Sequence, residues 1–135
     1  MHLLGILTSN KASPWAAWLA VVGYMALIFF LSGQSRPLDL TIDIPYFDVA
    51  AHVGEYGVLS LLIGRACRHT PNELIREEAW YVAIVGVALY GLTDEGHQAL
   101  VYGRTSEWKD WASDVAGAAL AQWGWSWWAR RKKKG

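Results

Sequence analysis

Polar residues able to do chemistry end a long apolar run in this chain. Thr93-Asp94-Glu95-Gly96-His97-Gln98 follows directly on the apolar segment 79–92. This placement puts two carboxylates, an imidazole and an amide where a bilayer would meet water. Each ionisable group would cost roughly 2.5 to 3.5 kcal/mol at the centre of a bilayer, so a cluster of them indicates a function. The segment therefore predicts a polar site in a small membrane protein.

Two other segments place further polar groups at helical spacing. Asp48, His52 and Glu55 are four and three residues apart, which puts them on one face of a helix. Asp110 and Asp114 share a face of a later helix, and this face continues as the small residues Gly117, Ala118 and Ala121. Small residues allow another helix to approach closely. The candidate acids and bases are Asp48, His52, Glu55, Asp94, Glu95 and His97.

Residues at the ends of these helices could complete a binding site. Arg104 follows the turn residue Gly103 and can fork onto a carboxylate or a phosphate. Thr105 or Ser106 is expected to cap the next helix. The candidate ligand-binding residues are Ser32, Gln34, Gln98, Arg104, Asp110 and Asp114, although Ser32 and Gln34 could equally be a helix terminus that satisfies its own backbone.

Three interpretations of these polar residues stay open. Arg104 could neutralise the aspartates while His52 and His97 bridge helices, giving a purely structural network. Arg104 could instead clamp an anionic headgroup beside a histidine or carboxylate that acts as acid or base. The two histidines and a carboxylate could also hold a divalent metal ion, but no metal ligand is assigned and the cofactor stays unknown.

The elements that must position these residues are four predicted transmembrane helices, at about 14–32, 47–66, 79–98 and 107–128, in a single domain over 1–135. Ser13 is placed to cap the first helix, with Pro14 at its first position. Thr70-Pro71-Asn72-Glu73 satisfies a capping box ahead of the third. Asp110, Asp114 and Gln122 interrupt the fourth, so an amphipathic surface helix is its alternative. The predicted fold is an all-α, four-helix membrane bundle.

The distribution of basic residues predicts the orientation of this bundle. Four spans place nine lysines and arginines on the side of the termini and three on the other. By the positive-inside rule, both termini are then cytoplasmic and the polar cluster faces outward. The nine are Lys11, Arg65, Arg68, Arg76, Arg130, Arg131, Lys132, Lys133 and Lys134; the three are Arg36, Arg104 and Lys109.

Composition excludes several classes of function. The chain is 53% apolar with nine tryptophans, which suits a bilayer with an interfacial aromatic belt. A formal net charge of zero gives no support to a nucleic-acid partner. The single cysteine, Cys67, rules out an intrachain disulfide or a thiolate metal cluster. A phosphate-binding loop and a nucleophile elbow are both absent, and whether the protein is an enzyme stays open.

Several of these segments, taken in order, resemble the VanZ-like family of small integral membrane proteins. The matching pieces are YMALIFFLSGQS (24–35), DVAAHVGEY (48–56), DEGHQ (94–98), Gly103-Arg104 and DWASDVAG (110–117). The resemblance implies a cell-envelope role, and the founding member is associated with low-level resistance to the glycopeptide teicoplanin.

We therefore expect a multi-pass protein of the inner (cytoplasmic) membrane that recognises or acts on an outer-leaflet lipid or lipid-linked glycan. Its expected partners are the lipid bilayer and a lipid-linked envelope precursor, and a homo-oligomer is left open. The alternative is a non-enzymatic structural or accessory membrane subunit with a buried Asp/Glu/His/Arg network.

Overall fold

The structure is a computed structural model that describes residues 13–34, 46–103 and 106–134. All regular elements in these ranges are helices: α2 (Pro14–Ser32), α3 (Phe47–Arg68), α4 (Glu73–Glu77), α5 (Ala79–Gln98) and α6 (Trp108–Lys132). The prediction of an all-α fold is confirmed for this part of the chain, and the four long helices begin within one residue of their predicted starts.

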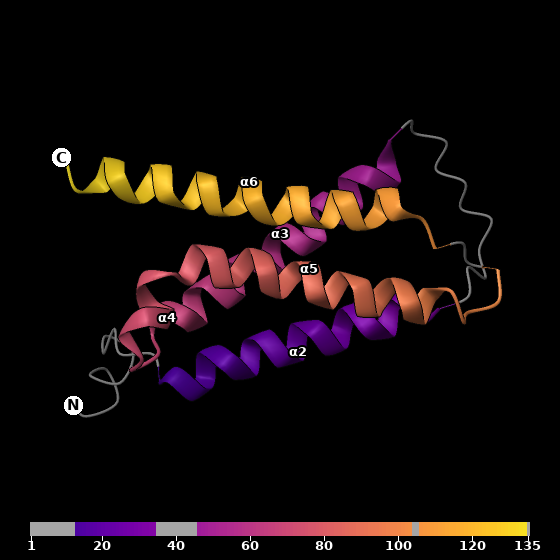
Figure 1. Ribbon diagram of the computed structural model, residues 1–135, viewed down its shortest axis with the longest axis horizontal. Helices are drawn as coiled ribbons and strands as arrows, with labels where there is room; N and C mark the ends of the chain where they lie inside the picture. The colour runs from indigo at the N-terminus through magenta and orange to yellow at the C-terminus, as the bar shows by residue number, and fades with distance from the viewer. Residues whose placement is uncertain (1–12, 35–45, 104–105, 135) are drawn as a thin grey trace, which may run out of the picture.

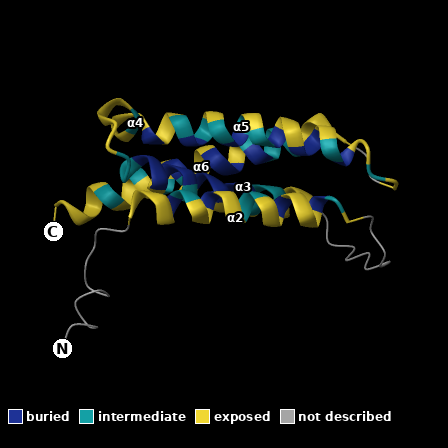
Figure 2. Cartoon of the chain, turned by 90° about the horizontal axis from the view of Figure 1, so that it is seen from below, coloured by how far each residue is buried: buried dark blue, intermediate teal, exposed yellow. Residues whose placement is uncertain are grey.

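The four long helices form an elongated bundle in which successive helices run in opposite directions (Figure 1). α3 lies at the centre and contacts each of the other long helices, whereas α2 meets only α3 and α5. Buried residues line the inner faces of the helices and exposed residues cover the outer faces (Figure 2). As a result, α2 begins and α6 ends at one end of the bundle, and the predicted polar residues gather at the other.

The core between these helices is built from small and medium apolar side chains. Leu59 and Ala66 of α3, Ala83 and Val87 of α5, and Ala118 of α6 are fully buried. Bulkier apolar residues point outward, as on α2, where Leu19, Val22 and Phe30 are more than half exposed. An outer surface this apolar is suited to contact with lipid or with another protein.

The most extensive helix contact, between α3 and α6, depends on glycine. A Cβ atom on Gly117 would overlap the carbonyl oxygen of Val53 and would lie 2.8 Å from its Cα atom. A Cβ on Gly57 would lie 3.4 Å from the carbonyl oxygen of Gly117. The prediction that the small-residue face of α6 admits a neighbouring helix is confirmed, and α3 is that neighbour.

Two of the predicted helix caps differ from the structure. Ser13 occupies the N-cap position of α2 and Pro14 follows at the first helical position, as predicted, but the Ser13 side chain makes no cap hydrogen bond. The cap of the predicted third helix is Asn72, whose Oδ1 accepts from the backbone N–H of Ile75 at 3.1 Å, and not Thr70. This cap belongs to the short α4, which ends before Glu78, so the helix does not run on unbroken into α5.

Of the described helices, only α2 is both long and apolar enough to be a clear membrane-span candidate. The other long helices have sufficient length, with 22, 20 and 25 residues in α3, α5 and α6. Each of them carries charged or amide side chains that lower its apolar character. Many of these polar groups lie inside the bundle, where the site described below is found.

Candidate functional site

Asp94 is the centre of a buried polar cluster that joins three helices. The hydroxyl of Ser32 at the end of α2 donates to Asp94 Oδ1 at 2.5 Å. Asp94 Oδ2 accepts from the Tyr56 hydroxyl of α3 at 2.8 Å and from Nε2 of Gln98, one turn further along α5, at 3.0 Å. All four residues are buried. Asp94 therefore has both carboxylate oxygens satisfied by neutral donors, with no cation among these partners.

His52 and Asp114 form a second pair, between α3 and α6. His52 Nδ1 lies 2.7 Å from Asp114 Oδ1, and the two side chains are 16% and 1% exposed. With Asp114 ionised, Nδ1–H donates to the carboxylate and the Nε2 atom becomes the basic nitrogen. Nε2 makes no hydrogen bond within the described part of the chain. A buried carboxylate that orients a partly exposed imidazole is an arrangement suited to proton transfer.

Three buried polar atoms near these clusters lack a partner among the described residues: Glu95 Oε1, His97 Nδ1 and Asp114 Oδ2. The other oxygen of Glu95 accepts from the Ser106 hydroxyl at 2.7 Å. Ser106 thus ties the connector to α5 and does not cap α6, which contradicts one of the two caps predicted there. The N-cap residue of α6 is the next residue, Glu107, and it makes no side-chain cap bond.

Gly91 makes the room that Asp114 occupies. A Cβ atom on Gly91 would lie 3.0 Å from Asp114 Oδ2 and 3.2 Å from the Trp111 ring. The indole N–H of Trp111 donates to the carbonyl of Ala88 at 2.9 Å, which fixes the ring against α5. The unpartnered oxygen of Asp114 is therefore held in a defined position at the α5–α6 contact.

The two histidines predicted for the site, His52 and His97, contact different helices. His97 stacks on the Phe29 ring of α2 with the ring centroids 4.0 Å apart, whereas His52 pairs with Asp114. No group of three or more His, Cys, Asp or Glu side chains that could hold a metal ion occurs in the ranges the structure covers. The structure thus gives the metal interpretation no support.

The remaining residues predicted for the site do not belong to these two clusters. Asp48 and Gln34 are exposed, with Gln34 Nε2 donating to the Phe30 carbonyl at 3.3 Å. Glu55 and Asp110 are half-buried, and their carboxylates act electrostatically on His52. Arg104 lies outside the described residues, so the predicted clamp has no structural description.

A third polar cluster was missed because Gln122 was treated only as an interruption of the fourth helix. Gln122 of α6 is buried, and its Nε2 donates to the carbonyl and hydroxyl oxygens of Ser60 at 2.8 and 3.1 Å. Its Oε1 accepts from Arg68 Nη2 at 3.0 Å. The available signal was an amide and a hydroxyl within otherwise apolar segments of two different helices.

The helical bundle of this protein has carboxylates inside and apolar side chains outside. These features place it in the class of small helical proteins suited to membranes. Comparison with protein-family models gives a match to VanZ/LLP1 over residues 8–129. The chain belongs to the VanZ/LLP1 family, as its ordered motifs predicted. Neither the curated proteins nor the solved structures gave a match.

Proposed function

We propose that this VanZ-like protein crosses the cytoplasmic membrane four times, with both termini in the cytoplasm and the Asp94 and His52–Asp114 clusters facing outward. Alternating helix directions support this topology, since α2 begins and α6 ends at the same end of the bundle (Figure 1). The basic residues Arg65, Arg68 and Arg76 lie at that end, in agreement with the positive-inside rule. Exposed apolar side chains on α2 support lipid contact.

We further propose that the outward polar end recognises an outer-leaflet lipid or lipid-linked glycan. The observation that carries this proposal is the His52–Asp114 pair, with an unpartnered and buried carboxylate oxygen on Asp114. Glu95 offers a second unpartnered acceptor at the same end. Carboxylate acceptors attract hydroxyl donors, which a sugar headgroup supplies in number, and repel phosphate. A phosphate on the same ligand would therefore depend on Arg104.

His52 gives this site a group that could move a proton as well as bind. Its imidazole is oriented by Asp114 and remains partly exposed, so it can accept a proton from a hydroxyl placed beside it. Action on an envelope glycan is one outcome of such chemistry, and a link to teicoplanin resistance belongs to the same proposal.

The rival proposal is a non-enzymatic accessory or structural subunit. Its support is Asp94, which is buried and whose two oxygens accept hydrogen bonds from three side chains of the bundle itself. A network satisfied in this way stabilises the packing of α2, α3 and α5. The two proposals differ in what His52 and Asp114 do, because only the first assigns them a ligand.

Native mass spectrometry of the detergent-purified protein, with bound lipids retained, separates these proposals. His52→Gln and Asp114→Asn should reduce retention of a specific glycan-lipid adduct by at least about tenfold, the effect of losing one charged hydrogen-bond partner. The matched control is His69→Gln, a histidine at the opposite end of the bundle, whose Nδ1 lies near the carbonyl of Arg65. Arg104→Ala tests a phosphate on the same ligand.

Two results would favour the structural role. One is folded parent protein without any specific adduct. The other is an adduct that both variants retain as well as the parent does, accompanied by a lower unfolding temperature of the variants. A loss of adduct with an unchanged unfolding temperature supports recognition.

A further inference from the structure

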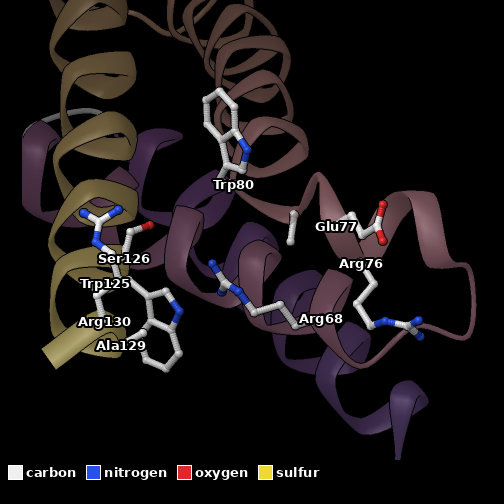
Figure 3. Close-up of a pocket in the computed structure, with 9 residues that line it drawn as sticks. Arg68, Arg76, Glu77, Trp80, Trp125, Ser126, Ala129 and Arg130 are labelled. Carbon is white, nitrogen blue, oxygen red and sulfur yellow. The ribbon is translucent and has the colours of Figure 1, made fainter. Parts of the chain in front are cut away.

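A cavity of about 260 Å³ lies at the end of the bundle opposite the His52–Asp114 pair, between α6, the end of α3 and the α4–α5 junction (Figure 3). We call it the arginine–tryptophan cavity. Three arginines and one glutamate, Glu77, carry its charge, which leaves a net charge of two positive. Its principal lining residues are Arg68, Arg76, Trp80, Trp125, Ser126 and Arg130.

The side chain of Arg68 is held in place in this cavity by neighbouring residues. Its Nη2 donates to Gln122 Oε1 at 3.0 Å, and its guanidinium carbon lies 5.2 Å from the centre of the Trp125 ring. Gly64 leaves space for this head group, since a Cβ there would lie 3.0 Å from Arg68 Nη1. The guanidinium has five N–H donors, so most of them remain available to a ligand after the bond to Gln122.

No carboxylate forms an ion pair with Arg68 in the described part of the chain. Arg76 contacts Glu73 only at 3.9 Å, and Figure 3 shows its head group turned away from Arg68. The cavity therefore holds positive charge that is not neutralised from within.

We propose that the arginine–tryptophan cavity binds the phosphate group of an anionic phospholipid of the cytoplasmic leaflet. Guanidinium groups match phosphate oxygens with paired N–H donors, and Arg68 and Arg130 stand on the two sides of the Trp125 ring in Figure 3. The cavity has the size of a headgroup and not of a whole lipid. The proposal rests on the four-span orientation above, but it concerns a separate site.

Exposed aromatic surface beside the cavity distinguishes a lipid from a free anion. Trp80 is 50% exposed and Trp125 is 39% exposed, so both present apolar ring surface next to the arginines. Indoles in such positions lie at the boundary between headgroups and acyl chains. A soluble phosphate would use the arginines alone, whereas a phospholipid also covers the rings. Basic pockets at the cytoplasmic ends of membrane helices bind anionic headgroups in this manner.

The test is a titration of the purified full-length protein with phosphatidylglycerol and with phosphatidylcholine of the same chain length, followed by native mass spectrometry. We expect specific binding of phosphatidylglycerol only. Arg68→Gln and Arg130→Gln should each weaken it about fivefold, the effect of one arginine near a membrane surface. The matched control is Arg65→Gln, which removes an exposed arginine one turn from Arg68 and should change binding little.

Equal loss of phosphatidylglycerol binding from all three variants would overturn the site, since it would show charge attraction without a cavity. Binding of inorganic phosphate as tightly as the lipid, measured without lipid, would overturn the lipid assignment. Arg130 is exposed, so its variant decides the matter even where Arg68→Gln does not fold. His52→Gln should keep phosphatidylglycerol binding, which separates failure here from failure of the outer site.

Discussion

At the scale of single residues, Asp94 shows how this bundle holds a carboxylate without a paired cation. Three neutral donors from α2, α3 and α5 reach its two oxygens, so each oxygen accepts at least one hydrogen bond inside the bundle. The same bonds tie the end of α2 to the rest of the molecule. Asp94 is thus expected to matter more for stability than for ligand binding.

Replacement of Asp94 by alanine should lower the free energy of unfolding by about 3 kcal/mol or more, because it leaves the Ser32 and Tyr56 hydroxyls and the Gln98 amide buried without an acceptor. Thermal or denaturant unfolding in detergent measures the change. Thr93→Ala is the control: Thr93 is exposed and bonds only its own helix at Tyr90, so its loss should cost less than about 0.5 kcal/mol. Similar losses for the two variants would contradict the role of Asp94.

The spacing of polar residues was sufficient to name Asp94, His52 and Asp114 as candidates but not to pair them. Helical spacing tells which residues share a face, whereas the pairing of His52 with Asp114 depends on how far α3 and α6 slide along each other. Sixty-two positions separate these two residues in the chain. No local pattern encodes that offset, and for the same reason the bond between Gln122 and Ser60 was not anticipated.

At the scale of elements, the α3–α6 contact depends on Gly117, which has no side chain. Gly117→Ala should destabilise the bundle by about 3 kcal/mol, because the added methyl group would overlap the Val53 backbone, which cannot move as a flexible side chain does. Detergent unfolding measures this effect. Gly54→Ala, on α3 beside Val53, has nothing within 4 Å of its added Cβ and should stabilise the helix by about 0.5 to 1 kcal/mol.

The observed bounds of the helices show which sequence features predicted a helix start or end correctly and which did not. The apolar runs and Pro14 indicated where the long helices begin, since these features act locally. The end of α6 lies at Lys132, beyond the predicted end at 128, because the basic residues continue the helix. Arg131 stacks over Trp127 at 4.0 Å and Lys132 over Trp128 at 4.4 Å, each pair being one helical turn apart.

At the scale of the whole molecule, the proposed topology places Tyr102 outside and Glu77 inside the cell. In a background in which buried Cys67 is replaced by alanine, Tyr102→Cys should react with a membrane-impermeant maleimide on intact cells, since Tyr102 is 94% exposed. Glu77→Cys should react only after permeabilisation. Reaction of Glu77→Cys on intact cells would contradict the four-span orientation.

The contrast between α2 and the other long helices bears on how the chain enters a membrane. α2 is apolar and can partition into lipid alone, whereas α3 and α6 shield His52 and Asp114 from lipid only by facing each other. A chain truncated after Arg68 should therefore hold α2 firmly and α3 loosely, as protease protection during synthesis would measure. Full protection of α3 at that length would contradict this expectation. Because His52 and Asp114 are shielded from lipid only when α3 packs against α6, firm anchoring of α3 in the membrane requires that α6 has been made.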